Sequence, residues 1–341
     1  MSSHAWLSHS LTDGRIECDA CYHRCKLHEG AYGICGVRRV ENGQLRLLVY
    51  AKAAAAHIDP IEKKPLFHFL PHSRVFSFGT VGCNFSCQFC QNHEISQYPK
   101  TKEHRIFGET LTPEMIVTLA LKQGCQSIAY TYNEPAVFFE YTYDTAKLAH
   151  EAGLKNIYVT SGYETPKAIE TIAPFLDAMN IDIKAFSQNF YHKICGASLQ
   201  PVLDTLAYAH QKGIWIETTT LIIPTLNDSD KELREIATFQ ATLDDAMPWH
   251  ISAFHPTYKM LHLPPTPHDT LKRAHAIGKE AGLKYVYVGN VDDASHESTY
   301  CPQCHNGVIS RHGHLGECVT NHLMCSGACP HCGYIIKGIW R

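Results

Sequence analysis

The sequence lacks several features that would assign a chain to a particular partner or compartment. Its 341 residues contain no extended basic or acidic run, and the formal net charge is −3. Nucleic-acid-binding proteins usually carry a basic patch, so this charge balance does not favour that class. No apolar stretch approaches the ~18 to 20 residues needed to cross a bilayer. The first residues also lack the basic and then apolar segments of a signal peptide, so we expect a cytoplasmic protein.

Cysteine and histidine, in contrast, are abundant. The chain has 15 cysteines and 23 histidines. Because the cytoplasm keeps thiols reduced, metal ligation explains most of the cysteines better than disulfides do. Cys125 and Cys195 stand alone and are expected to be ordinary thiols. The others form three groups: Cys18, Cys21, Cys25 and Cys35; Cys83, Cys87 and Cys90; and Cys301, Cys304, Cys318, Cys325, Cys329 and Cys332.

Strand and helix patterns alternate between the second and third cysteine groups. Runs such as "RVFSFGT", "SIAYTY" and "NIYVTSG" predict strands, and Thr112-Pro113 and Thr165-Pro166 predict helix starts. Repeated strand–helix units indicate an α/β fold with a parallel sheet. Six or seven units are too few for a closed eight-stranded barrel, which leaves a partial barrel or an open doubly wound sheet. We favour a partial (β/α)6-type TIM barrel over residues 73–294, between a cysteine-rich module with its linker (1–72) and a zinc-ribbon-like module (295–341).

The second cysteine group follows the strand "RVFSFGT" directly, in the spacing C-x3-C-x2-C. Active sites of such folds lie at the carboxyl ends of the strands. Three thiolates from one loop suit a [4Fe–4S] cluster, which normally takes four, so one iron would keep an open position for a ligand. A zinc ion completed by a histidine such as His93 is the alternative. We favour the cluster.

This loop resembles the signature of the radical S-adenosylmethionine (SAM) superfamily. The segments "CDACYHRCKLHEGAYGICGVR", "DPIEKKPLFHFLPHS" and "IIKGIWR" extend the resemblance to the AmmeMemoRadiSam-system radical enzymes over essentially the whole chain. The resemblance implies a [4Fe–4S] cluster on Cys83, Cys87 and Cys90. It implies that SAM binds the open iron and is cleaved to a 5′-deoxyadenosyl radical, which takes hydrogen from a small molecule, a peptide or a protein. It further implies an electron donor such as flavodoxin or ferredoxin, and Memo-like and AMMECR1-like partners.

Polar residues at later strand ends are the expected SAM contacts. Asn133 and Glu134 look like a substitute for the Gly-Gly-Glu motif of the superfamily, with Glu134 on the methionine ammonium; a simple turn is the alternative. Similarity to pyruvate formate-lyase activating enzymes implies ribose or carboxylate contacts for Asp182 and Lys184, which could instead form a buried ion pair. The complete expected set is Asn133, Glu134, Ser161, Asp182, Lys184 and His255.

The two flanking cysteine groups predict further metal sites. "CPQC" at 301–304 and "CPHC" at 329–332 are paired knuckles typical of one tetrahedral zinc ion, with rubredoxin-like iron as the alternative. Cys318 and Cys325 remain as a substitute ligand pair or as free thiols. The first group, C-x2-C-x3-C-x9-C, fits either zinc or a second iron–sulfur cluster, and its spacing does not decide between them.

The segment ahead of the three-cysteine loop bears on which kind of radical enzyme this is. Glycyl-radical activating enzymes have Asp-Gly-Pro-Gly there, whereas this chain has Asp59-Pro60-Ile61-Glu62-Lys63-Lys64-Pro65. The charged residues of this segment either line the mouth of the active site or form a solvated turn. Activation of a glycyl-radical enzyme is therefore the second hypothesis. A non-catalytic iron–sulfur and zinc interaction protein is the third.

Overall fold

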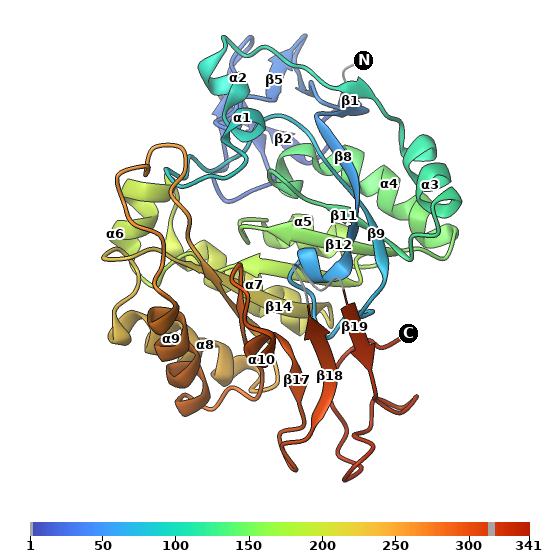
Figure 1. Ribbon diagram of the computed structural model, residues 1–341. Helices are drawn as coiled ribbons and strands as arrows, with labels where there is room; N and C mark the ends of the chain where they lie inside the picture. The colour runs from blue at the N-terminus through green and yellow to red at the C-terminus, as the bar shows by residue number, and fades with distance from the viewer. Residues whose placement is uncertain (1–2, 313–317) are drawn as a thin grey trace.

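A mostly parallel sheet forms the centre of the computed structural model, which describes residues 3–312 and 318–341 (Figure 1). Its strand order is β16-β15-β14-β13-β12-β11-β9-β8, and all neighbours are parallel except β8, which runs antiparallel to β9. The predicted α/β class with a parallel sheet is therefore confirmed. The strands are β8 (Ala55–Pro60), β9 (Arg74–Gly79), β11 (Ser127–Tyr130), β12 (Lys155–Thr160), β13 (Ala178–Asp182), β14 (Trp215–Ile222), β15 (Trp249–Ala253) and β16 (Val286–Gly289).

Helices connect these strands, and both predicted helix starts are confirmed. The Thr112 and Thr165 hydroxyls each accept a hydrogen bond from the amide three residues later, with proline in the first helical turn. In the described part of the chain, no helix has both the length and the apolar character needed to span a membrane. The longer helices are α3 (Pro113–Lys122), α4 (Phe139–Glu151), α5 (Pro166–Ile172), α7 (Leu199–Gln211), α8 (Asp230–Leu243) and α9 (His268–Glu280). The shorter ones are η1 (Ile61–Lys63), α1 (His93–Ser96), α2 (Tyr98–Thr101), η2 (Pro135–Phe138), α6 (Gln188–Phe190), the π-helix η3 (Tyr191–Cys195) and α10 (Ala294–Glu297).

The N-terminal module consists of short antiparallel strands that lie beside α1 and α2 (Figure 1). It is fixed to α4 by the buried Arg38, whose guanidinium lies 2.7 Å from a carboxylate oxygen of Glu140. The edge of the Trp6 ring also packs on Phe139. The module contains the sheets β1-β6-β5 and β2-β3-β4, and β7 pairs with β10. The strands are β1 (Ser3–His4), β2 (Ser8–Ser10), β3 (Ile16–Cys18), β4 (Lys26–Leu27), β5 (Arg38–Glu41), β6 (Gln44–Leu47), β7 (Lys52–Ala53) and β10 (Glu109–Thr110).

The C-terminal module lies at the opposite end of the molecule from the N-terminal strands (Figure 1). Its antiparallel sheet comprises β17 (Thr299–Tyr300), β18 (Gly307–His312) and β19 (Cys318–Asn321). Segment 61–73 connects this module to the central sheet. The Pro65 carbonyl accepts a hydrogen bond from Asn180 in β13 at 2.7 Å, and the Phe67 carbonyl accepts one from the buried Arg311 at 2.7 Å. Through these bonds, segment 61–73 holds the C-terminal module against the central sheet.

Candidate active site

A cavity of about 510 Å³ lies where the strands of the central sheet end. Its volume is within the range of sites that enclose a small molecule or cofactor. Seven of the nine residues predicted to bind the cluster or SAM line this cavity. Residues from sequence positions 83 to 184 thus meet in one place because parallel strands end at the same edge. The seven are Cys83, Cys87, Cys90, Asn133, Ser161, Asp182 and Lys184.

The loop that carries the three cysteines is held by bonds from distant parts of the chain. The Asn133 side-chain amide donates to the Gly82 carbonyl at 2.7 Å. The Ser86 amide donates to the Cys195 carbonyl at 2.8 Å, in the π-helix η3. The Lys100 ammonium donates to the Phe85 carbonyl at 2.7 Å. These bonds fix the backbone of the loop from three sides of the chain, as a site of defined geometry requires.

The three thiols of the loop differ in their surroundings and in their exposure. Cys83 and Cys87 are buried, and Cys90 is partly exposed, with its sulfur 3.2 Å from the Ser96 hydroxyl oxygen. A hydrogen bond with the Cys195 thiol and burial raise the pKa of Cys87, and burial raises that of Cys83. Such thiols become thiolates when a metal ion replaces the proton. Cys195, predicted to be an ordinary thiol, is buried but lies against the loop.

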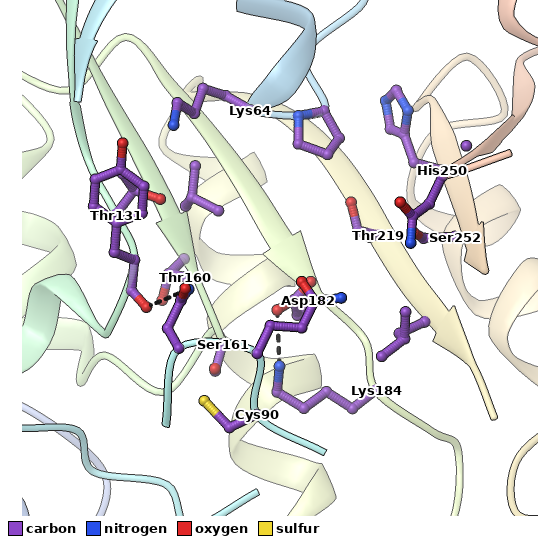
Figure 2. A pocket seen from close by; sticks show the side chains of 18 of the residues that line it. Lys64, Cys90, Thr131, Thr160, Ser161, Asp182, Lys184, Thr219, His250 and Ser252 are labelled. Carbon is purple, nitrogen blue, oxygen red and sulfur yellow. Dashed lines mark hydrogen bonds and ion pairs between the residues drawn. The ribbon is translucent and has the colours of Figure 1, made fainter. Parts of the chain in front are cut away.

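Asp182 and Lys184 form an ion pair on the cavity wall, with Nζ 2.8 Å from Oδ2 (Figure 2). Burial alone would lower the pKa of Lys184, but Asp182 raises it well above its ordinary value, so the ammonium stays charged. The two interpretations of the Asp-x-Lys pattern are therefore compatible. The residues pair with each other and also face the space where a ligand would lie.

Glu134 and His255 are placed beside the cavity. Within the described part of the chain, neither belongs to the cavity lining. The buried Glu134 carboxylate accepts hydrogen bonds from the Thr160 hydroxyl at 2.7 Å and from the Ser161 amide at 2.9 Å. Glu134 therefore holds the backbone of Ser161, which lines the cavity, but does not itself line the cavity. The exposed His255 ring lies 3.3 Å from the carbonyl oxygen of Asn290, which does line the cavity.

The end of the cavity away from Cys90 is formed by Lys64 and His250 (Figure 2). Glu62 and Lys63 line the cavity as well, whereas Asp59 does not belong to its described lining. Of the two alternatives for this charged segment, the structure favours a position at the cavity over a solvated turn. The buried Lys64 ammonium lies 2.7 Å from an Asp59 carboxylate oxygen, and burial lowers the pKa of this lysine.

Glu217 organises the wall next to this end. Its buried carboxylate lies 2.7 Å from Nε2 of His250, which lines the cavity. The same carboxylate accepts the backbone amides of Phe67 and His68 at 2.9 and 2.8 Å. Burial opposes the charge of Glu217, but the bond from His250 lowers its pKa, so it remains a carboxylate. The sequence did not point to His250, because its role depends on a strand and a segment far away in the chain.

The region that carries most of this cavity matches a known family. Residues 78–239, which include the cysteine loop and the Asp182–Lys184 pair, match the Radical SAM superfamily. The chain belongs to the radical SAM superfamily.

Two relatives of this radical SAM chain differ in how much of its length they match. The Methanocaldococcus jannaschii protein named "Uncharacterized protein MJ0808" is 44% identical over 303 residues, which cover 89% of each chain. A pyruvate formate-lyase-activating enzyme from Clostridium pasteurianum is 25% identical over 162 residues, 46% of this chain and 65% of the relative. The similarity to the first relative extends over nearly the whole chain, whereas the similarity to the second covers less than half of it.

A solved structure shares the fold. Streptococcus suis SuiB bound to S-adenosylmethionine superposes with a TM-score of 0.51 at 12% identity, over 71% of this chain and 56% of that one. At this identity the likeness concerns the arrangement of strands and helices alone.

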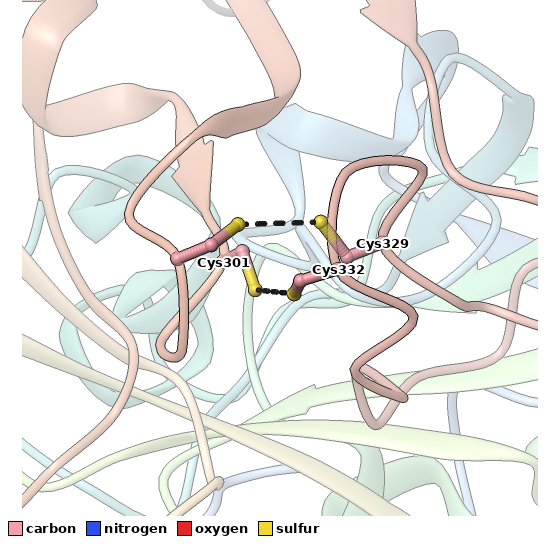
Figure 3. Close-up of side chains that lie close together, drawn as sticks. Cys301, Cys329 and Cys332 are labelled. Carbon is pink, nitrogen blue, oxygen red and sulfur yellow. Dashed lines mark hydrogen bonds between the residues drawn. The ribbon is translucent and has the colours of Figure 1, made fainter.

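Four cysteines of the C-terminal module form a second, much tighter group (Figure 3). The sulfurs of Cys301 and Cys332 are 3.6 Å apart, and those of Cys304 and Cys329 are 3.7 Å apart. Tetrahedral thiolate ligands at 2.3 Å from one ion would be about 3.8 Å apart. Hydrogen bonds from Asn306 lower the pKa of Cys304 to about 6, which favours the thiolate that binds metal. The four sulfurs are placed to hold a single metal ion.

Cys83, Cys87 and Cys90 fit the group that the radical SAM superfamily implies, a [4Fe–4S] cluster with SAM. Among the described residues, these three sulfurs do not form a group within 4.8 Å of one another, in contrast to the C-terminal four. Thiolates that bind separate irons of a cluster must stand farther apart than thiolates around one ion. The loop therefore has the number of donors that a cluster needs, its sulfurs are not gathered around one point as the C-terminal four are, and the cavity has room for a ligand beside it.

We expect the Cys329→Ser variant to lose one metal ion per chain, as measured by elemental analysis of the purified protein. Loss of the ion should loosen the C-terminal module, because metal binding supplies much of the folding free energy of such small units. Trp340, which packs 5.2 Å from His68, reports this through its fluorescence. The exposed Cys325, outside the four-cysteine group, gives the matched control Cys325→Ser. Equal metal content in both variants would contradict the assignment of the ligands.

A second expectation concerns Glu297, which lines the cavity beside the C-terminal module. Burial raises the pKa of Glu297 from 4.5 to about 7, although Arg311 opposes this. The folded chain thus binds this proton more tightly than the unfolded chain, and stability falls as the pH rises from 4.5 through 7. The loss amounts to about 3 kcal/mol at most.

Glu297→Gln removes this titration, so thermal unfolding should show the variant gaining stability relative to the parent protein between pH 5 and pH 8. The partly exposed Glu235, replaced in the same way, serves as the control. A stability difference that is the same at both pH values for Glu297→Gln would refute the expectation.

Proposed function

We propose that this protein is a radical SAM enzyme that initiates its reaction at the cavity described above. When bound, the cluster and SAM supply the chemistry: one-electron reduction cleaves the sulfonium to methionine and a 5′-deoxyadenosyl radical, which abstracts hydrogen from a substrate. The observation that carries this proposal is the convergence of Cys83, Cys87 and Cys90 on one cavity with the Asp182–Lys184 pair.

The roles of the side chains follow from their positions. The three loop cysteines hold the cluster, and Ser161, Asp182 and Lys184 offer hydrogen bonds and charge to the polar ends of SAM. Asn133 fixes the loop through Gly82. We assign Glu134 to support of the Ser161 wall rather than to direct contact, because its oxygens already accept three bonds from Thr160, Ser161 and Ala136. His255 stands at the rim, next to Asn290.

The shape of the central sheet is part of the proposal. Loop or strand residues from each of the parallel strands β9 and β11 to β16 line the same cavity. A flat sheet would spread these residues along one edge, so a sheet that curves into a partial (β/α)6-type barrel explains their meeting. Phe85 and Phe89 also line the cavity and would exclude water from a reactive radical.

We further propose zinc for the C-terminal site, since paired C-P-x-C knuckles with four thiolates are typical of closed structural zinc sites. The substrate and the partners are the least constrained part of the proposal. Resemblance alone supports a flavodoxin or ferredoxin donor and Memo-like and AMMECR1-like partners.

A second candidate is the activation of a glycyl-radical enzyme. The similarity to the Clostridium pasteurianum activating enzyme favours it. The sequence Asp59 to Pro65, which replaces the Asp-Gly-Pro-Gly segment, weighs against it, since Lys64 of this segment lines the cavity.

The test of the first proposal is anaerobic. Reconstituted protein, reduced with dithionite and mixed with SAM, should release 5′-deoxyadenosine and methionine in equal amounts, as measured by liquid chromatography. No release with a fully loaded cluster, in the presence or absence of cell extract, would favour a non-catalytic binding protein instead. A glycyl-radical signal that appears only after addition of a glycyl-radical enzyme would favour the second candidate.

A further inference from the structure

The four N-terminal cysteines surround a small hollow of their own, apart from the active-site cavity. Cys18, Cys21 and Cys35 are buried, and Cys25 is partly exposed. The hollow is otherwise lined mainly by apolar side chains and by the buried Arg38. Four thiols that face one space from four sequence positions form a donor set for a metal group, and such a closed set leaves no place for a substrate ligand.

The spacing of these sulfurs decides which kind of metal group fits. In the part of the chain that the structure describes, the C-terminal four cysteines form a group within 4.8 Å, but no three of the N-terminal sulfurs do. A single tetrahedral ion needs its thiolates about 3.8 Å apart. A cubane cluster places each thiolate on a different iron atom, so its ligands stand farther apart. Among the described residues, neither the N-terminal four cysteines nor Cys83, Cys87 and Cys90 include three sulfurs close enough to surround one ion.

The wall of this hollow touches the catalytic loop. Gly82, one residue before Cys83, lies so close to the N-terminal module that a Cβ atom there would be 2.8 Å from the Cys35 carbonyl oxygen and 2.4 Å from Val37. A ring nitrogen of His23 lies 2.9 Å from the Asn84 carbonyl oxygen. Residues next to the N-terminal cysteines therefore contact the loop on both sides of Cys83.

The charge of a thiolate-bound group is compatible with this hollow. Arg38 lines it and is oriented by hydrogen bonds to Glu140 and to the Val137 carbonyl. A fixed guanidinium at the wall of an otherwise apolar site offsets part of the negative charge that four thiolates introduce.

We propose that Cys18, Cys21, Cys25 and Cys35 hold a second [4Fe–4S] cluster, with a thiolate on every iron. This site is separate from the cavity on which the proposed function rests, and either assignment can fail without the other. Because every iron is coordinated by a cysteine, this cluster does not bind SAM.

The test uses the triple variant Cys83→Ala/Cys87→Ala/Cys90→Ala, which leaves the N-terminal module unchanged. After anaerobic reconstitution it should contain about four irons and about four sulfides per chain, and the parent protein about eight of each. The electron paramagnetic resonance spectrum of the reduced variant should not change when SAM is added. An iron-free triple variant, with or without a second zinc ion, would overturn the proposal.

Two further measurements separate this proposal from the proposed function. If the parent protein and the triple variant each contained about four irons, the N-terminal cysteines would hold a cluster and the Cys83–Cys90 loop would not. The proposed function would then fail, but this inference would not. The variant Cys18→Ser/Cys21→Ser/Cys25→Ser/Cys35→Ser should lose about four irons but keep the C-terminal metal ion, which shows that the chain is still folded there. An unchanged iron content in this variant would also overturn the proposal. Cys125→Ser, a buried thiol outside both sites, is the control.

Discussion

Replacing Cys90 with alanine should reduce the release of 5′-deoxyadenosine from SAM to the level of a protein-free control. The catalytic loop offers only three thiolates, and a cubane that loses one of them has two protein ligands left, too few to hold it. Cys90 is the most informative of the three, because it is partly exposed and its loss removes little packing. Iron should fall by about four per chain, while the C-terminal metal ion is retained.

The matched control for this prediction is Cys125→Ala. Cys125 is also a free thiol, it is buried, and it lies outside the cavity lining. The control should keep the iron content and the activity of the parent protein, although its stability will fall slightly from the lost packing. If Cys90→Ala released as much 5′-deoxyadenosine as Cys125→Ala, the three-cysteine loop would not hold the catalytic cluster.

The sequence predicted the features of this fold that depend on neighbouring residues. The apolar runs correspond to β9 and β11 to β16, and Thr112-Pro113 and Thr165-Pro166 begin helices. In a parallel α/β fold these local patterns also locate the site, because every strand ends at the same edge. This is why Ser161, Asp182 and Lys184 could be assigned to one cavity without knowledge of the structure.

The sequence predicted less well which way a side chain points from a strand end. Glu134 lies at a strand end, as expected, but its carboxylate is bound by Thr160 and Ser161 behind the wall. Burial and the neighbouring Glu134 charge raise the pKa of Glu164, whose carboxyl oxygen lies 2.7 Å from the same Thr160 hydroxyl oxygen. Because that hydroxyl has one proton, which it donates to Glu134, the protonated Glu164 is the donor in this second contact. This arrangement of two carboxyl groups around one hydroxyl comes from two loops, and no spacing in the sequence reveals it.

Residues brought in by long-range packing were missed for the same reason. His250 and Cys195 carry no motif, and they reach the site through Glu217 and through the π-helix η3. The short strands of the N-terminal module, two to four residues each, also gave no periodic signal. They form because the buried Arg38 and its neighbours pack against α4, and tertiary packing of this kind outweighs weak local preference.

The Arg38→Met variant should lose about 3 to 5 kcal/mol of unfolding free energy, the second large effect that we expect. Arg38 is 2% exposed and Glu140 1%, and the guanidinium donates two bonds to that carboxylate, at 2.7 and 3.1 Å. Methionine fills similar space but leaves the Glu140 charge buried without its partner, which costs far more than the loss of a surface pair. Urea unfolding under anaerobic conditions measures the change.

Two controls make this prediction specific to burial. Arg234 pairs with Glu280 at 3.0 Å, but both side chains are about half exposed, so Arg234→Met should cost less than about 1 kcal/mol. The double variant Arg38→Met/Glu140→Leu removes both charges, and it should be more stable than Arg38→Met alone because no unpaired charge remains. A double variant that is less stable by the sum of the two single losses would mean that the pair is not coupled. In that case packing, and not charge, would join the N-terminal module to α4.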